Sequence, residues 1–225
     1  MFELIRRIRS ARRFRNYEKE HPGNYYSTHC FDYYKCLFVH IPKTAGISVC
    51  TTLFGNLAGG HTTLADYSDR YPQATFRSYF KFAFVRNPYD RLHSAFYFLK
   101  AGGISSEDRA FRDHYLNGDM NFREFVMEVL SPESKQLIYH LRPQVEYITL
   151  KADPENIALD FVGRFESLPA DFATAAAHIG LGDKRLPHEN KNPGKKYYRD
   201  EYSDEMFRRA AQIYKKDFEL LGYEM

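Results

Sequence analysis

The sequence lacks tryptophan, has three cysteines in 225 residues, and contains no apolar run near the ~20 residues that a membrane-spanning helix needs. Its first residues also lack the apolar core of a signal peptide. Cys30, Cys36 and Cys50 are odd in number and show no metal-type C-x-x-C spacing, which predicts reduced, mostly buried thiols. We therefore expect neither a membrane-spanning protein nor a secreted disulfide framework, and we expect a cytoplasmic location.

The composition is that of a packed protein, with 44% apolar residues, 19 phenylalanines and 18 tyrosines. The formal net charge of +3 is unevenly placed, because residues 1–20 carry seven basic and three acidic side chains, a net +4. Leu4, Ile5 and Ile8 lie among these arginines at near-helical spacing. We expect a solvated leader helix that packs one apolar edge on the domain; a short membrane-surface or polyanion-binding helix is the alternative. The predicted organisation is a basic leader, residues 1–30, and one domain, residues 31–225.

Short apolar runs alternate with helical patterns along the chain. Residues 36–41 and 81–85 predict buried strands, and a helical pattern follows each of them, from about Ile47 and from Asn87–Pro88. Such alternation predicts an α/β fold with a central, mainly parallel sheet flanked by helices. Further segments are expected as a strand at 161–163, an edge strand at 145–150, and helices at 63–71, 122–130, 132–140, 169–179 and from Ser203 to about Phe218.

A lysine and a turn of small residues follow the first predicted strand. Pro42 ends the apolar run, and the turn leads directly into a helical pattern. Free backbone N–H groups and the positive end of a helix dipole then point at one spot, and a lysine side chain adds a full charge. The residues concerned are Lys43, Thr44, Ala45, Gly46, Ile47 and Ser48. The segment predicts a phosphate or sulfate site, although its order differs from the G-x-x-x-x-G-K-[ST] loop; an ordinary strand–turn–helix connection is the alternative.

An arginine stands directly after the second predicted strand. Arg86 is placed at the carboxyl end of a sheet strand, where open α/β sheets bind ligands, and Ser94 follows two helical turns later. An arginine fork and a hydroxyl at this spacing can share one phosphate. A nucleoside triphosphatase typically has an aspartate near this point to hold magnesium, so a metal-free anion fits better than Mg-ATP. A structural salt bridge for Arg86 and a plain surface serine for Ser94 are the alternatives.

Together, these motifs resemble a known enzyme family. Residues 40–46 (HIPKTAG) and 82–95 (FAFVRNPYDRLHSA) resemble the two signatures of carbohydrate sulfotransferases, the group with heparan sulfate 2-O- and chondroitin-type enzymes and many bacterial relatives. The resemblance extends to residues 163–166, 186–191 and 214–223, and it covers roughly residues 35–223 in the expected order. It implies a P-loop-like three-layer domain and a bacterial-type member of the family.

The resemblance also implies the donor 3′-phosphoadenosine 5′-phosphosulfate (PAPS), the product 3′-phosphoadenosine 5′-phosphate (PAP), and no metal. By analogy, residues 43–48 hold the 5′-phosphosulfate, and Arg86 and Ser94 hold the 3′-phosphate. We expect Arg164 to approach the adenine. The loop at 191–198 is expected to close over the donor, with Lys195 and Lys196 at the 3′-phosphate; a solvated basic loop is the alternative.

An acceptor hydroxyl must lose its proton, so the reaction requires a general base. His61 is the favoured residue, because it follows a Gly-Gly turn just after the first crossover helix, and similar bacterial sequences carry a histidine in an equivalent H-x-T segment. His40 is expected in the core, and His93 is a weaker rival. Other residues left open are His188, which we expect to order its loop or touch ligand, and the carboxylates Glu107 and Glu146.

The acceptor is expected to be a glycan or glycolipid, with no nucleic-acid partner. Basic residues between positions 104 and 150 form the expected acceptor wall and hint at an acidic saccharide: Arg109, Arg112, His114, Lys135 and Arg142. Two other functions stay open at this point. One is an ATP-dependent kinase or phosphotransferase that uses magnesium, and the other is a non-catalytic polyanion- or membrane-binding module on the same fold, which would use residues 1–20.

Overall fold

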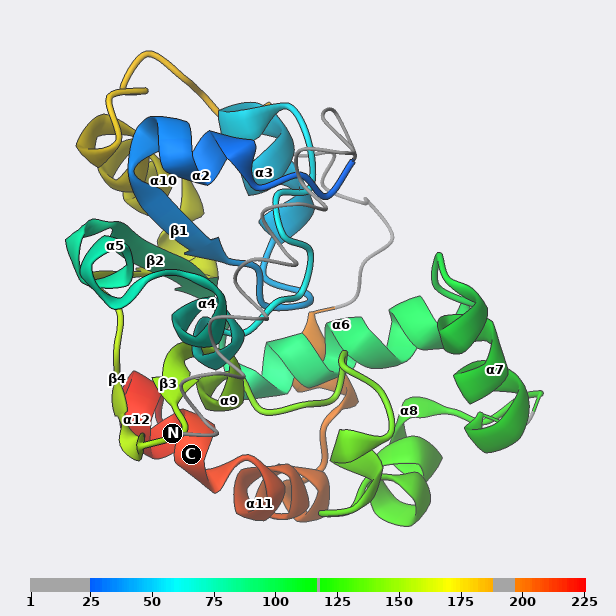
Figure 1. Ribbon diagram of the computed structural model, residues 1–225. Helices are drawn as coiled ribbons and strands as arrows, with labels where there is room; N and C mark the ends of the chain where they lie inside the picture. Colours follow the sequence, from blue (N-terminus) through cyan, green and yellow to red (C-terminus); the bar gives the residue numbers. More distant parts are fainter. Residues whose placement is uncertain (1–24, 117, 188–196) are drawn as a thin grey trace. The chain divides into compact units, whose positions relative to one another are not determined.

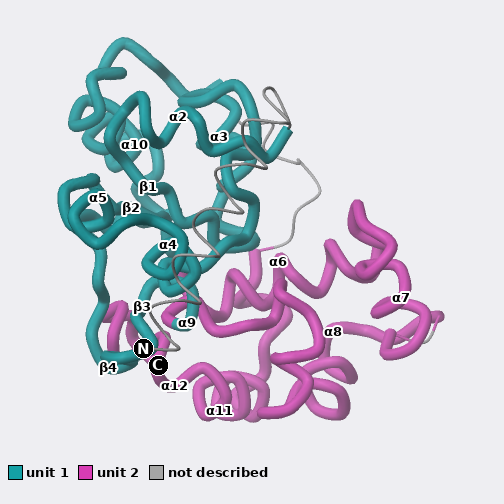
Figure 2. The backbone as a smooth tube through the Cα atoms, viewed as in Figure 1, with its two compact units in different colours: residues 1–85, 146–189 teal, residues 86–145, 190–225 magenta. Residues whose placement is uncertain are grey.

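The computed structural model describes residues 25–116, 118–187 and 197–225 (Figure 1). Two compact units divide the chain, residues 1–85 with 146–189 and residues 86–145 with 190–225 (Figure 2). Each unit is described by itself. The predicted leader helix, His188, Lys195 and Lys196 lie outside the described residues.

The first unit contains a parallel sheet in the order β1-β2-β5, formed by Cys36–Val39, Phe80–Val85 and Phe161–Arg164 (Figure 1). All four residues of β1 and the last five of β2 are buried, as in strands that are covered on both faces. Helix α2 (His29–Tyr34) packs against β1, and α10 (Leu168–His178) packs against β5. The predicted α/β class with a central parallel sheet is confirmed.

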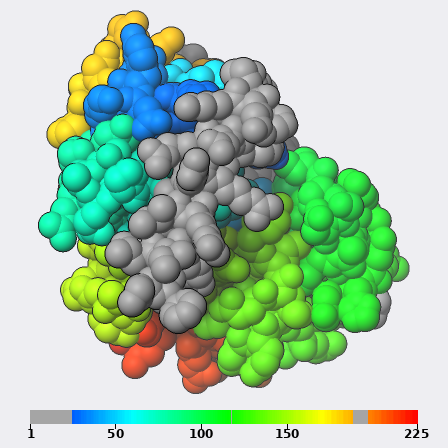
Figure 3. Space-filling model, viewed as in Figure 1, coloured from blue at the N-terminus to red at the C-terminus, as the bar shows by residue number. Residues whose placement is uncertain are grey.

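Three helices connect β1 to β2: α3 (Gly46–Phe54), α4 (Leu64–Arg70) and α5 (Gln73–Ser78). Helix α4 begins as the sequence predicts, because Thr63 and Asp66 form a reciprocal capping box. Helix α5 is an element that the sequence pattern did not indicate; it lies at the surface of this unit, where Arg77 and Ser78 are exposed (Figure 3).

The predicted edge strand at residues 145–150 is wrong for most of its length. Residues Val145–Ile148 form the short helix α9, and only β3 (Thr149–Leu150) is extended, paired antiparallel with β4 (Asp153–Ile157). A buried carboxylate explains the helix: Asp217 accepts hydrogen bonds from the backbone N–H groups of Gln144 (2.9 Å) and Val145 (3.0 Å). This cap satisfies donors at the helix start, a contact from a distant segment that local apolarity cannot reveal.

The second unit is helical. Helix α6 (Pro88–Lys100) begins with Asn87 as its N-cap and Pro88 in its first turn, as predicted. Its apolar side packs into a core with residues such as Phe125 and Phe218. The other elements of this unit are α7 (Ser106–Tyr115), α8 (Phe122–Glu124), the π-helix η1 (Phe125–Val129), the 3₁₀ helices η2 (Ser134–Gln136) and η4 (Tyr198–Glu201), α11 (Asp204–Ile213) and α12 (Lys215–Leu221).

Two predicted helices of this unit are shorter than expected. At residues 132–140 only the 3₁₀ turn η2 forms, because the hydroxyls of Ser131 and Ser134 accept hydrogen bonds from each other's backbone N–H groups and compete with helical bonding. The final helix is divided at Tyr214, whose backbone (φ −103°, ψ 23°) leaves the helical region. The Tyr214 hydroxyl donates to the carbonyl of Leu141 (2.8 Å), so a tertiary contact accompanies the break.

All three cysteines are free thiols, and Cys36 and Cys50 are buried, as predicted. Burial raises the pKa of both buried thiols, so they stay protonated in the core. Among the residues that the structure describes, no helix is both long enough and apolar enough to cross a membrane.

Candidate active site

The lysine turn, residues 42–46, has an unusual backbone. Lys43 and Ala45 adopt positive φ angles of 70° and 67°, which residues with a β-carbon rarely adopt. The fully buried Thr44 helps to hold this shape, because its hydroxyl donates to the carbonyl of Ile41 (2.9 Å). The Thr44 hydroxyl is therefore engaged within the turn, and the backbone N–H is the donor that Thr44 offers to an anion. Strained backbone of this kind concentrates at functional sites.

Helix α3 begins directly after the turn, and its first amides are suited to an anion. The residue at its N-cap is Ala45, whose methyl group cannot accept a hydrogen bond. The N–H groups of Gly46, Ile47 and Ser48 form the first turn of this nine-residue helix, where the helix dipole is positive. The half-buried Lys43 lies in the same turn. The turn thus has the geometry expected of a phosphate or sulfate cradle, and the binding of such an anion stays a prediction.

His40 lies beneath this turn, and its imidazole explains why residue 46 is glycine. A β-carbon on Gly46 would lie 1.8 Å from Cδ2 of His40. His40 is 4% exposed, so the expectation that it is buried is confirmed. Its position against the turn is new, since nothing in the sequence marks a core histidine as the support of a ligand loop.

His40 also holds His61, the predicted general base. Nδ1 of His61 lies 2.8 Å from the carbonyl oxygen of His40, and the two ring centroids are 4.4 Å apart. A carbonyl oxygen only accepts, so Nδ1 carries the proton, and in the neutral imidazole Nε2 is the acceptor nitrogen. His40 precedes Lys43 by three residues, and the fold thus brings a correctly protonated imidazole to the strand end that carries the lysine turn.

Arg164 ends β5 in the same unit. It pairs in register with Val85, the residue that directly precedes Arg86. Its backbone N–H donates to the Asp171 carboxylate (2.7 Å), and its side chain is half-buried before the 3₁₀ helix η3 (Phe165–Ser167). Arg164 is therefore at the carboxyl end of the sheet, where open α/β sheets bind ligands, and its approach to the adenine stays a prediction.

Arg86 and Ser94 belong to the second unit. Arg86 is 3% exposed, and its Nε and Nη2 atoms both lie 2.7 Å from Oδ2 of Asp90. The salt bridge that the sequence left open as an alternative is thus present, and it sets the plane of the guanidinium. Ser94 is half-buried on α6, two turns after Arg86. A phosphate at this point would share the arginine fork with Asp90.

Gln144 and Asp217 fix the backbone of Arg86, and sequence reasoning missed both. The fully buried Gln144 side chain accepts from the Arg86 N–H (2.9 Å) and donates to the Arg86 carbonyl (2.8 Å). Asp217, also fully buried, accepts from the Gln144 backbone, and Gln144 Nε2 lies 3.4 Å from its carboxylate. Burial raises the pKa of Asp217 above its ordinary value, with Arg91 opposing the rise. The available signal was a single glutamine directly before a short segment with three apolar residues, Val145, Tyr147 and Ile148.

Replacing Gln144 by leucine should lower the free energy of unfolding by about 3 kcal/mol. The Arg86 N–H and carbonyl would both lose their buried partner, and each unsatisfied group costs roughly 1–3 kcal/mol. Urea unfolding of the full chain measures the effect. Gln136→Leu is the matched control, an exposed glutamine of the same unit, with an expected change within about 0.5 kcal/mol. Equal changes for the two variants would contradict this role of Gln144.

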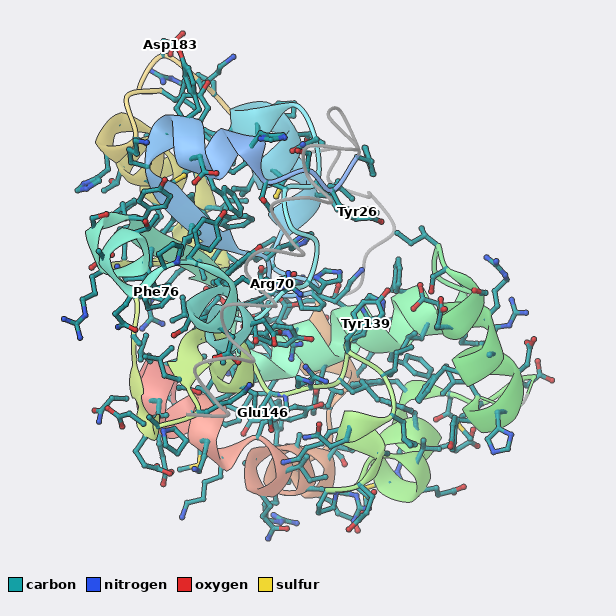
Figure 4. The ribbon with its side chains drawn as sticks, in the orientation of Figure 1. Tyr26, Arg70, Phe76, Tyr139, Glu146 and Asp183 are labelled. Atoms are coloured by element: carbon teal, nitrogen blue, oxygen red, sulfur yellow. The ribbon has the colours of Figure 1, made fainter. Side chains whose placement is uncertain are left out.

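The other proposed bases fit the role less well. His93 is buried and its Nε2 lies 3.0 Å from Glu201, which also accepts from the Tyr97 hydroxyl. Glu107 is exposed on α7, where its own backbone N–H and Ser105 lower its pKa and make it a weaker base. Glu146 is exposed on α9. Its side chain is labelled in Figure 4.

The predicted acceptor wall lies in the second unit. Arg109 and His114 are exposed on α7, and Arg112 pairs with the neighbouring Asp113 (2.7 Å). The remaining members, Lys135 and Arg142, are half-buried. Their role toward an acceptor stays a prediction.

Comparisons with known proteins show the family of this chain. The family described as "Sulfotransferase family" matches residues 26–224, a span that includes both motifs. Carbohydrate sulfotransferase 14 of Danio rerio is 27% identical over 229 residues, which cover 86% of this chain and 61% of that protein. The chain therefore spans about three fifths of the length of this curated relative. No solved structure matches the chain. The match supports neither the kinase nor the non-catalytic alternative, and the chain belongs to the sulfotransferase family.

Proposed function

We propose that this protein transfers a sulfuryl group from PAPS to a hydroxyl of a carbohydrate or glycoconjugate by in-line displacement. One observation carries the proposal: the His40 carbonyl holds His61 through Nδ1 at the strand end that leads into the lysine turn. A base and an anion cradle with a lysine are the two devices that sulfuryl transfer to a hydroxyl requires. The carbohydrate sulfotransferase named above supports a glycan acceptor.

The residues of the first unit would act as follows. PAPS supplies the sulfuryl group as a substrate. His61 Nε2 takes the proton of the acceptor hydroxyl while the acceptor oxygen forms its bond to sulfur. The bond between sulfur and the oxygen of the 5′-phosphate breaks, and its electron pair stays on that oxygen. Lys43 and the first amides of α3 then stabilise the new negative charge, and PAP is the leaving product.

For the nucleotide, we propose that Arg86 and Ser94 bind the 3′-phosphate and that Arg164 approaches the adenine. Arginine suits a phosphate better than lysine because its planar guanidinium carries five N–H donors, and here the phosphate would share this group with Asp90. Lys195 and Lys196 would add to the 3′-phosphate contacts, although both lie outside the described residues. These roles require no metal ion.

Calorimetry of the full chain tests the proposal. PAP should bind with EDTA present, and Mg-ATP should not bind. Transfer of labelled sulfate from PAPS to a panel of oligosaccharides should then be detectable. Binding of Mg-ATP without binding of PAP would overturn the proposal and restore the kinase alternative.

We also propose a bacterial-type, cytoplasmic protein whose residues 1–20 contact the anionic face of a membrane. The net charge of +4 in this segment supports such contact. Deletion of residues 1–20 should abolish binding to liposomes that contain an anionic lipid and leave PAP affinity unchanged. If the deletion leaves liposome binding intact, the membrane contact is wrong. The protein would instead be a non-catalytic binding module if two results were found together. The wild-type protein would transfer no labelled sulfate from PAPS, and the deletion would abolish binding to heparin.

A further inference from the structure

A pocket of about 400 Å³ lies at the amino end of the parallel sheet, within the first unit. Its lining comes from the end of α5, the starts of β2 and β5, and the last two turns of α10, which are labelled in Figure 1 apart from β5. The carboxyl ends of β1 and β5 lead instead to the lysine turn and to Arg164. The pocket is therefore separate from the proposed site of transfer, and its volume is within the range of small-molecule sites, roughly 300–1,000 Å³.

Three aromatic side chains line this pocket: Phe80, Phe161 and His178. The His178 ring stacks on Phe80, with centroids 3.8 Å apart and planes inclined by 20°. Phe80 in turn lies nearly parallel to the buried ring of Phe82, at a centroid distance of 5.5 Å, so the rings continue from the core to the surface. His178 is exposed although one of its faces covers Phe80. Its other face can therefore receive a further planar ring.

Arg77 gives the pocket a positive charge. It is exposed in the last turn of α5, and its guanidinium forms neither a hydrogen bond nor an ion pair with the residues that the structure describes. The preceding Phe76, labelled in Figure 4, is 6% exposed and anchors this turn in the core. The backbone of Arg77 is thus held at the pocket while its side chain is available to an anion.

Asp160 is the only carboxylate among the described residues that line the pocket, and Lys81 already neutralises it. Oδ2 of Asp160 accepts from the backbone N–H of Lys81 (2.7 Å) and pairs with its ammonium group (2.8 Å). The buried ammonium group also donates to the carbonyl of Tyr79 (2.7 Å), which holds it in place. The charge of Arg77 therefore determines which ligands the pocket favours, and it favours anions.

We propose that this pocket is a second ligand site, for a small aromatic carboxylate whose ring extends the stack of Phe80 and His178 and whose carboxylate pairs with Arg77. The inference goes beyond the proposed function, because the pocket contains none of the residues assigned to PAPS or to the acceptor. Aromatic rings favour offset stacking, and the guanidinium fork matches a carboxylate. A neutral ligand would leave Arg77 without a partner, and an anion without a ring would leave the stack unused.

The first test measures the charge. Naphthoate, a fused aromatic ring pair with one carboxylate, is titrated into the full chain by calorimetry with PAP present, so that the proposed donor site is filled. Arg77→Gln should weaken binding by about tenfold, the scale of one charge-assisted hydrogen-bonded pair. Naphthamide, which has the same rings without the charge, should bind wild type and Arg77→Gln equally. Arg185→Gln is the matched control, an exposed arginine of the same unit outside the pocket, and should retain the wild-type affinity for naphthoate.

The second test measures the ring. His178→Ala should weaken binding of both naphthoate and naphthamide by about tenfold, within the range for loss of a stacking aromatic, and His178→Phe should retain it. His29→Ala, which removes an exposed histidine of α2, is the control. In NMR spectra of wild type, naphthoate should shift the imidazole signals of His178, which are assigned by their absence in His178→Phe.

The outcomes separate this inference from the proposed function. If wild type does not bind naphthoate, or binds it without a shift of the His178 signals, the second site is wrong. Equal naphthoate affinity of Arg77→Gln and Arg185→Gln would overturn the role of Arg77, and equal affinity of His178→Ala and His29→Ala would overturn the ring contact. Failure of PAP to bind would overturn the proposed function alone, because the variants locate naphthoate in the pocket whether or not the donor site is filled.

Discussion

Replacement of Lys43 by alanine should lower turnover with PAPS by about two to three orders of magnitude, the scale for loss of one preorganised charge-stabilising group. The ammonium group is proposed to stabilise charge that appears on the phosphate oxygen only as the bond to sulfur breaks. The substitution should therefore act on turnover far more than on the affinity for PAP. The turn itself should persist, since alanine meets the same backbone restriction as lysine at a φ of 70°.

Lys35 provides a matched control for this experiment. It is a lysine of the same unit, it also has a positive φ (53°), and it is exposed at the end of α2. Lys35→Ala should leave turnover unchanged. This variant controls for the loss of a lysine from a residue with positive φ, whatever its effect on the stability of the fold. Equal turnover in Lys43→Ala and wild type would remove Lys43 from the mechanism.

Replacement of His61 by alanine or asparagine should lower turnover by about a hundredfold or more, the scale of general base catalysis, and leave PAP affinity nearly intact. The asparagine variant is the sharper test. Its side-chain amide can donate to the His40 carbonyl from the position of Nδ1, so it keeps the observed hydrogen bond without providing a base. Turnover of purified variants and calorimetry with PAP measure the two effects.

Two further measurements separate a base from a structural histidine at position 61. Added imidazole should partly restore turnover of the alanine variant, because it can take the proton in place of the missing ring. His29→Ala, which removes an exposed histidine on α2, should leave turnover unchanged. Near wild-type turnover of His61→Asn, or a large loss of PAP affinity in both variants, would make His61 a structural or binding residue.

Local patterns were sufficient for the sheet and for most helix starts. The strands β1 and β2 were predictable because strands covered on both faces have continuous apolar runs, and the half-buried β5 was predictable from its apolar residues Phe161 and Val162. The starts of α4 and α6 were predictable because their capping residues act within three positions of the helix start. These signals depend on neighbours in the chain, so no tertiary information is needed to interpret them.

The failures occurred where a distant residue decides the local conformation. Helix α9 replaces an expected strand because Asp217, more than seventy residues away, caps its start. The break at Tyr214 accompanies a hydrogen bond to Leu141, and no local breaker residue marks it. A single sequence carries no signal for such long-range contacts.

The same division applies to the site. Lys43, Arg86 and His61 could be proposed from the sequence, because their residue types and their order after strands suit an anion and a base. The contact of His40 with Gly46 and the hydrogen bond between its carbonyl and His61 could not be predicted from the sequence, because a histidine in an apolar strand is usually only part of the core. The bidentate hold of Gln144 on Arg86 is likewise visible only in three dimensions.

The sequence by itself determined the α/β class, the anion-binding character of the lysine turn and the family resemblance, since each depends on residue type and short-range order. The tertiary structure alone decided which nitrogen of His61 carries the proton, why residue 46 has no side chain, and what holds Arg86 in place. The physical reason is that protonation, steric exclusion and backbone support depend on atoms a few ångströms apart, and folding brings those atoms together from distant parts of the chain.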